Sequence, residues 1–245
     1  MAETPNANMP MFYTSPRPMD RAKDGHLKIS RPKHYKFAAK TNAIPVLVDE
    51  FPMAAAHYPI VFAAGPHPVP AAVVGLRNDN NMFIDAEGMW LEGSYLPAYV
   101  RRYPFILMDD PEDKQFVLCI DEASDMLAAE GEYALFDGEN ASDFTKGAME
   151  FCAALRQQGD ATDEFVKALQ EYGLLTTNDA KIGMPDGTQL QLSGFQIVDA
   201  KKFDMLPDNI YLQWRRKGWI GLIYAHLLSS HRWPQLVTMA QGKSA

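Results

Sequence analysis

Short apolar runs fill the first half of the chain, between residues 43 and 136. They are rich in Val, Ile and aromatic residues, and they include IPVLV, YPIVFAAG, VPAAVVGL, NMFID, AYVRRYPFILM and FVLCID. Such runs are typical of β-strands, and the polar segment LRNDNNMF predicts a hairpin turn between two of them. Prolines recur throughout these runs and cannot donate to a central ladder. We therefore expect an irregular, bulged and mainly antiparallel sheet.

Beyond residue 140 the apolar positions follow a helical period. The first helix is predicted to end at Gly159, and its stripe consists of Phe144, Ala148, Phe151, Cys152 and Leu155. Residues 160–163 resemble the capped start of a second helix that ends before Gly173. Residues 181–199 predict a hairpin with its turn at 185–187, and residues 200–233 predict two helices separated at Gly218.

Strands and helices do not alternate along the chain, which argues against a doubly wound fold. We predict an α+β fold with an irregular, mainly antiparallel β-rich half at residues 26–140. A smaller, mainly helical half with a β-hairpin is predicted at residues 141–245, and the two halves are expected to form one compact unit. Residues 1–25 are polar and proline-rich, so we expect an extended or disordered arm there.

Composition narrows the class of protein. The chain has 245 residues, 47% of them hydrophobic, which is enough for a sizeable core. Its net charge of −8 argues against a general nucleic-acid binder. No apolar run approaches the length of a membrane span, and no signal segment is visible. Cys119 and Cys152 lie in apolar contexts and are expected to be buried free thiols. We therefore expect a cytoplasmic protein.

Charge is unevenly spread along the chain. Residues 14–40 hold eight Lys or Arg against two Asp, whereas residues 104–164 hold sixteen Asp or Glu against three bases. Both regions are expected to be solvated surfaces, as most charge runs are. The alternative is that a basic arm docks on an acidic helical half.

The segment SYLPAYVRRYPFILMDD combines prolines, aromatic residues and two adjacent arginines. If it forms one strand, Arg101 lies on the same face as Tyr99 and Tyr103, and Arg102 lies on the other face. An arginine on an aromatic face needs stacking and a carboxylate partner, for which Asp49, Glu50 and Asp121 are candidates. Alternatively, the guanidinium grips a carboxylate or phosphate of a ligand. The candidate ligand-binding or partner-binding residues are Tyr99, Arg101, Arg102 and Tyr103.

Acid–base candidates are fewer. Asp49-Glu50 and Asp121-Glu122 each close an apolar run, and they would raise one another's pKa if their strands were neighbours. His226 lies in an apolar helix with serines three and four residues further on, which suits a structural histidine or an acid–base group. The histidine spacings match no zinc motif, and no glycine-rich phosphate loop occurs. No metal and no cofactor are expected.

Several segments closely resemble the bacterial SapC family. They include HYPIVFAAG, VVGLRNDNNMFIDAEGMWLEGSYLPAYVRRYPFILM, LCIDE, GFQIVDAKKFDMLP and GWIGLIYAHLLSS. The resemblance covers roughly residues 26–235. Members of that family tend to be encoded near non-haem iron oxygenases, flavin-dependent halogenases and outer-membrane receptors, which implies an accessory role. The family is named after proteins of crystalline surface layers, and it supplies no catalytic residues.

Three hypotheses follow for the function. The first is a non-enzymatic binding or accessory protein that recognises a small ligand or a protein partner through the segment at 95–105. The second is an enzyme with an acid–base or metal site between the two halves that uses Asp49, Glu50, Asp121 or His226. The third is a structural protein of a surface layer.

Overall fold

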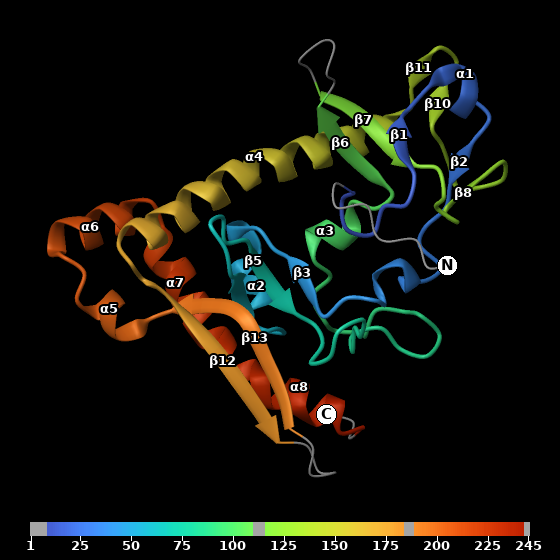
Figure 1. Ribbon diagram of the computed structural model, residues 1–245. Helices are drawn as coiled ribbons and strands as arrows, with labels where there is room; N and C mark the ends of the chain where they lie inside the picture. The colour runs from blue at the N-terminus through green and yellow to red at the C-terminus, as the bar shows by residue number, and fades with distance from the viewer. Residues whose placement is uncertain (1–8, 110–115, 184–188, 243–245) are drawn as a thin grey trace.

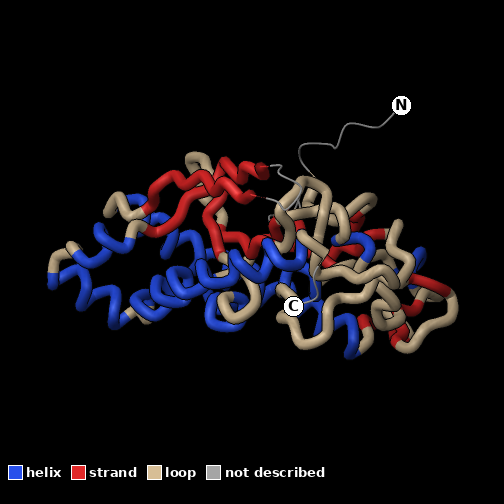
Figure 2. The backbone as a smooth tube through the Cα atoms, turned by 90° about the horizontal axis from the view of Figure 1, so that it is seen from below, coloured by secondary structure: helices blue, strands red, loops and turns tan. Residues whose placement is uncertain are grey.

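The computed structural model describes residues 9–109, 116–183 and 189–242 (Figure 1). It has mixed helices and antiparallel sheets, which confirms the predicted α+β class. Seen from below, the molecule is elongated, with helices gathered at one end and loops with short strands at the other (Figure 2). The turn expected at 185–187 lies outside the described residues.

The larger sheet has five antiparallel strands. Their order is β12 (Leu175–Gly183), β13 (Gln189–Val198), β4 (Ile60–Ala63), β5 (Pro70–Val73) and β3 (Ala43–Pro45). Pro70 begins β5 and Pro45 ends the edge strand β3, the positions where a missing N–H costs least. Because β13 pairs with β4 at Phe195–Ala63, the hairpin of the second half completes a sheet begun in the first. The two halves therefore share one sheet.

A second sheet of three strands has the order β1 (Pro16–Pro18), β7 (Phe116–Asp121) and β6 (Phe105–Asp109). Two smaller groups lie beside it. β2 (Lys28–Ile29) pairs with β8 (Leu127–Ala128) and β9 (Tyr133–Ala134), and β10 (Phe136–Asp137) pairs with β11 (Asn140–Ala141). An extended or disordered arm is expected at residues 1–25. Within residues 9–25 the strand β1 is extended, whereas the short helix α1 (Arg21–Asp24) departs from the expectation.

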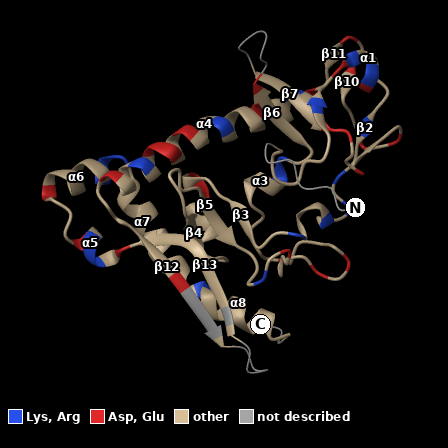
Figure 3. Ribbon diagram, in the orientation of Figure 1, with Lys and Arg blue, Asp and Glu red and all other residues tan. Residues whose placement is uncertain are grey.

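The basic residues 14–40 pair with acids of the β-rich half, and none of their ion pairs in the described residues reaches the helical half at 141–245. Arg17 reaches Glu122 at 2.5 Å and Arg31 reaches Glu132 at 3.2 Å, and these pairs join residues 14–40 to residues 104–164. Figure 3 shows α1 with its basic residues close to acidic residues around β10 and β11. Exposed pairs of this kind contribute at most about 1 kcal/mol each, so they orient the arm more than they stabilise it.

The apolar run AYVRRYPFILM is not one strand. Residues 98–101 form the short helix α3 (Ala98–Arg101), and the strand begins only at Phe105, after a cis Tyr103–Pro104 peptide bond. The helix starts where the amide of Ala98 donates to the Glu50 carboxylate at 2.7 Å. That contact satisfies one of the free N–H groups of the first turn. It comes from a residue 48 positions earlier, so local alternation could not reveal it.

Other runs are strands only in part. IPVLV divides between β3 and the 3₁₀-helix η2 (Val48–Glu50), which leads into α2 (Phe51–Ala54). NMFID contributes one isolated bridge, from Ile84 to Trp90. Another 3₁₀-helix, η1, spans Lys36–Ala38.

The two helices predicted on either side of Gly159 are a single helix, α4 (Asp143–Glu171), of 29 residues. Its start is capped by Ser142, whose hydroxyl accepts from the Thr145 amide at 3.2 Å. Thr162, expected in a second cap, instead donates to the Gln158 carbonyl at 2.8 Å and accepts from the Val48 amide at 3.1 Å. Tertiary packing therefore carries the helix through a glycine that local rules would place at its end.

The remaining helices follow the hairpin: α5 (Ala200–Asp204), α6 (Asp208–Arg216), α7 (Trp219–Ser229), the 3₁₀-helix η3 (Ser230–Arg232) and α8 (Trp233–Ala240). Gly218 separates α6 from α7 with a φ of 78°, as the sequence predicts. None of the helices in the described ranges is both long enough and apolar enough to span a membrane.

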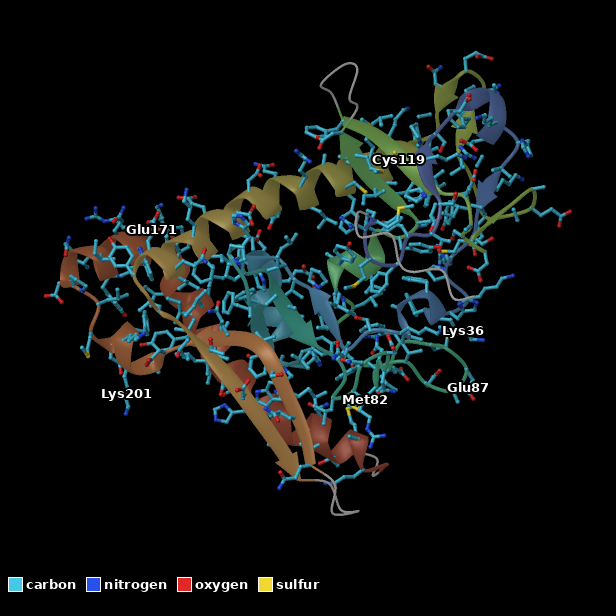
Figure 4. All side chains as sticks on the ribbon, in the orientation of Figure 1. Lys36, Met82, Glu87, Cys119, Glu171 and Lys201 are labelled. Carbon is cyan, nitrogen blue, oxygen red and sulfur yellow. The ribbon has the colours of Figure 1, made fainter. Side chains whose placement is uncertain are left out.

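Two cores meet along α4. The larger one surrounds the five-stranded sheet and includes Phe51, Phe62 and Phe165. The smaller one lies between β6, β7 and the first half of α4, and it contains Phe105, Ile120 and Cys152. Cys152 and Cys119 are both buried free thiols, as predicted, and Cys119 is labelled on β7 in Figure 4.

Candidate ligand-binding site

A pocket of about 440 Å³ lies where the end of α3, the loop at 29–32 and the first half of α4 meet. This size is within the usual range for small-molecule sites. The wall is mostly apolar and aromatic. Its main side chains are Ile29, Phe105, Met126, Phe144, Phe151 and Cys152. Arg101 and Arg102 also line it, so the structure brings both arginines to one cavity.

The strand interpretation placed these arginines on opposite faces, and that was wrong. Arg101 ends α3 and Arg102 is its C-cap residue. Successive residues of a helix are separated by about 100° around the axis, compared with about 180° in a strand. The helical turn therefore allows both side chains to reach the same cavity.

Arg102 is half-buried and stacks on aromatic rings. Its guanidinium carbon lies 3.9 Å from the ring centroid of Tyr99 and 5.7 Å from that of Tyr13. Its buried Nε has no hydrogen-bond partner among the described residues. Burial raises the pKa of Tyr13, and the charge of Arg102 acts against that rise. Arg102 thus has aromatic faces around it but no carboxylate in the described parts of the chain.

Arg101 is more exposed than its neighbour. Its guanidinium carbon lies 5.3 Å from the Phe151 centroid and 6.0 Å from that of Tyr95, and Nη2 donates to the Tyr95 hydroxyl at 3.4 Å. Within the described ranges it too forms no ion pair. Aromatic rings therefore orient both guanidinium groups, the Tyr95 hydroxyl also orients Arg101, and N–H groups are left for another acceptor.

Glu50 supports this arrangement from behind α3. One oxygen accepts from the Tyr95 hydroxyl at 2.9 Å and from the Ala98 amide, and the other accepts from the Leu47 amide at 2.9 Å. Burial, followed by the Glu50 charge, raises the pKa of Tyr95 to about 12. Tyr95 therefore stays a phenol that donates to Glu50 and accepts from Arg101. The carboxylate acts on Arg101 through Tyr95 and does not touch it directly.

Asp121 accepts hydrogen bonds from the arm, as Glu50 does from the start of α3. It is fully buried, and its oxygens accept from the amides of Thr14 and Ser15 at 2.9 and 2.8 Å. It also accepts from the Tyr103 hydroxyl at 3.2 Å. Burial, with Asp121 adding to it, raises the pKa of Tyr103 to about 12. Tyr103 is thus an element of the wall: it holds Asp121 and stacks on Phe37 with centroids 4.1 Å apart.

The acid–base candidates do not gather at one place. Asp49 and Glu50 lie in η2, beyond β3 of the larger sheet, whereas Asp121 ends β7 of the smaller sheet. The two acidic doublets therefore do not close neighbouring strands, which is the condition under which they would raise one another's pKa. Asp49 is exposed, and no described hydrogen bond connects any two of the four candidates.

His226 belongs to the larger core. Its Nε2 accepts from the Val198 amide at 3.0 Å, and its ring lies 5.1 Å from that of Phe62. Burial lowers the pKa of His226 to about 4, and a contact with the Ile60 backbone acts the other way. The neutral imidazole is therefore the form present near pH 7. Ser229, three residues further on, binds the Ile60 amide at 2.9 Å and does not bond to the histidine ring.

No group of three or more His, Cys, Asp or Glu side chains in the described residues is arranged to hold a metal ion. The thiol of Cys152 in the pocket is not an activated nucleophile. Burial raises the pKa of Cys152 to about 11, although the charge of Arg102 lowers it in part. At neutral pH Cys152 is therefore a thiol, and thiols are poor nucleophiles.

Comparison with known proteins gives one match that decides the family. The family model for SapC matches residues 19–236 of the chain. The chain belongs to the SapC family. Neither a curated protein nor a solved structure matches it.

The SapC match includes η2, α3, β6, β7 and α4, and with them Arg101, Arg102, Glu50 and Asp121. Tyr13, whose ring centroid lies 5.7 Å from the guanidinium carbon of Arg102, lies before the matched range. The residues that line the pocket of this SapC-family chain all lie within the matched range.

Sequence reasoning found the two arginines but missed three of their neighbours. Tyr13 and Tyr95 both contact a guanidinium, as does Phe151. The sequence holds one signal for Tyr13, an aromatic pair Phe12-Tyr13 in an otherwise polar arm. Phe151 was recognised as part of a helical stripe, but nothing in its spacing connects it to position 101.

Proposed function

We propose that this SapC-family chain is a non-enzymatic binding protein whose pocket between α3 and α4 holds a small molecule with an apolar or aromatic body and an anionic oxygen group. The observation that carries the proposal is the pair Arg101 and Arg102. Both line the pocket, both stack on aromatic rings, and neither has a carboxylate partner in the described residues.

The charges around the pocket support an anionic ligand. Arg31 and Asp143 also line it, but Arg31 lies 3.2 Å from Glu132 and Asp143 lies 3.0 Å from Lys146. Those two charges are balanced locally, which leaves the positive charges of Arg101 and Arg102. A cation–π contact contributes about 0.5–2 kcal/mol. It does not satisfy the N–H groups of a half-buried guanidinium, so an acceptor on the ligand would complete the site.

The apolar part of the wall supports an apolar ligand body. Phe105, Phe144 and Phe151 present aromatic surface to the cavity, and Ile29 and Met126 add aliphatic surface. Burial of such surface contributes about 25 cal/mol per Å², so the body of the ligand supplies affinity. The two arginines supply orientation and select for charge.

The protonation states support binding over catalysis. Burial raises the pKa of Cys152 to about 11 and that of Tyr103 to about 12, so neither group exchanges a proton easily near pH 7. An enzyme that uses Asp49, Glu50, Asp121 or His226 stays a prediction. So do the cytoplasmic location, the surface-layer role and the association with non-haem iron oxygenases or halogenases.

The test is a titration with 1-anilinonaphthalene-8-sulfonate, an aromatic sulfonate whose fluorescence rises in apolar sites. We expect saturable binding to the folded chain, weakened in Arg102→Gln by about ten- to hundredfold, the equivalent of a charged hydrogen bond of roughly 1.5–3 kcal/mol. Arg101→Gln should weaken it less, because Arg101 is more exposed. Decanoate should displace the probe, and decanol should not.

Arg156→Gln is the matched control. Arg156 also stacks on a ring, 3.6 Å from the Phe116 centroid, and lies 3.7 Å from Asp109, but it does not line the pocket. Its substitution should leave the titration unchanged. Equal affinity in the wild type and in Arg102→Gln, or an equal loss in Arg156→Gln, would contradict the proposal. Circular dichroism confirms that each variant is folded.

A further inference from the structure

Helix α7 is apolar on two faces. Trp219, Ile223 and His226 lie on one face and are buried in the larger core. The other face carries Tyr224 and Leu228, which are 48% and 61% exposed. The outward face of a surface helix in a monomeric protein is normally polar. An exposed Leu and Tyr one turn apart on the same helix therefore indicate a face that another molecule covers.

This face borders a groove of about 700 Å³ between α2 and α7. The two helices pack against each other and lie side by side in Figure 1. Ala55 and Ala56 form one wall; Gly221, Ala225 and Leu228 form the other. The small alanine and glycine side chains of these walls leave room for the backbone of a docking helix to approach. Leu228 provides an apolar anchor. A groove of this shape is typical of sites that take an amphipathic helix.

The charge at one end of the groove is positive and unbalanced. His231 and Arg232 are the basic side chains of its lining, and Arg232 forms no ion pair with any carboxylate of the described ranges. His57 lies nearby: burial lowers its pKa, and the charge of Arg232 lowers it further. Residues 200–242 hold six Lys or Arg against two Asp in a chain of net charge −8. Figure 4 shows Lys201 extending away from α5.

We infer that the groove between α2 and α7 docks an acidic amphipathic helix of a partner protein, with leucine-like side chains against Tyr224 and Leu228 and a carboxylate at Arg232. The concave shape favours a helix over the flat surface of a bilayer. A second copy of this chain would bring another basic end and no acid from the groove lining. Charge complementarity therefore favours a different, acidic partner.

The experiment measures fluorescence polarisation of a fluorescein-labelled model peptide. Its leucines recur at i, i+3, i+4 and i+7, and glutamates fill the other positions. A scrambled peptide of the same composition and a peptide with lysine in place of glutamate serve as comparisons. We expect saturable binding of the glutamate peptide alone. Leu228→Asp should weaken it at least about tenfold, as for a central interface anchor. Arg232→Glu should weaken the glutamate peptide and strengthen the lysine peptide.

Met149→Asp is the matched control, since Met149 is a comparably exposed apolar residue on α4, away from the groove. It should leave binding unchanged. The inference is overturned by absence of saturable binding, by equal binding of the scrambled peptide, or by full affinity of Leu228→Asp. It is also overturned if the groove serves another occupant. That outcome would appear as Leu228-dependent binding to phosphatidylglycerol vesicles, or as a Leu228-dependent dimer in sedimentation, without binding of the peptide.

Discussion

Asp121→Ala should be among the most destabilising single substitutions in the smaller core. The carboxylate accepts four hydrogen bonds: from the amides of Thr14, Ser15 and Ala123 and from the Tyr103 hydroxyl. These bonds tie the arm to the end of β7 and hold Tyr103 in the wall of the pocket. The substitution removes all four acceptor contacts at once and leaves buried donors unpaired.

The magnitude follows from the burial of each donor. Thr14 is exposed and can turn its amide to water, and the contact with Ala123 is long at 3.3 Å. Ser15 and Tyr103 are less accessible, so their donors are expected to stay unpaired. Each such loss from a charged acceptor costs roughly 1.5–3 kcal/mol, which gives about 3–6 kcal/mol for the two donors. Asp121→Asn keeps one acceptor oxygen and should cost about half as much.

Urea unfolding followed by tryptophan fluorescence measures the loss, and amide hydrogen exchange at residues 14 and 15 locates it. Glu122→Ala is the neighbouring control. The Glu122 side chain is 50% exposed and pairs with Arg17, so solvent screens the pair and its loss should cost far less than that of Asp121. If Asp121→Ala costs no more than Glu122→Ala, the assignment of Asp121 as the anchor of the arm is refuted. Should Asp121→Ala fail to fold, Asp121→Asn still provides the comparison.

Two further predictions concern pH and the glycines. Burial lowers the pKa of His226 from 6.5 to about 4. The contribution of His226 to the free energy of unfolding is therefore highest above pH 6.5 and falls as the pH falls, because the unfolded chain then binds a proton that the folded imidazole excludes. The decrease reaches roughly 3 kcal/mol at pH 4. Urea melts of His226→Gln should lack this pH dependence. Gly159→Ala should raise the free energy of unfolding by about 0.5–1 kcal/mol, since its Cβ meets nothing within 4 Å. Gly75→Ala should lower it by about 1–3 kcal/mol, because a Cβ would lie 1.8 Å from the Asn80 carbonyl oxygen; thermal melts compare the two.

Local periodicity predicted those elements whose pattern and packing agree. The strands β4, β5 and β7 lie within apolar runs, and Gly218 separates two helices as expected. Local periodicity failed where a contact with a residue distant in the sequence decides the secondary structure. The bond from Ala98 to Glu50 makes residues 98–101 helical, and the bond from Val48 to Thr162 holds α4 intact past Gly159. Neither contact leaves a local trace in the sequence.

In the candidate site too, the local sequence pattern predicted some features, and contacts between distant residues decided the others. The residue pattern of the segment predicted that one of the two arginines needs aromatic stacking, and the structure supplies aromatic faces for both Arg101 and Arg102. The candidate carboxylates proved to be anchors for other donors: Glu50 holds the start of α3, and Asp121 holds the arm. Which donor each acid meets depends on the packing of the two sheets, and strand-end position in the sequence does not determine that packing.

Helix α4 runs through both cores of the elongated molecule. Its 29 residues extend about 43 Å, and its first half packs in the smaller core while its second half packs in the larger one. Lys217, at the end of α6, reaches Glu164 on the second half at 2.6 Å. A rotation of α4 about its axis would therefore move side chains in both cores at once. Helix α4 therefore couples the pocket at one end of the molecule to the helices at the other end.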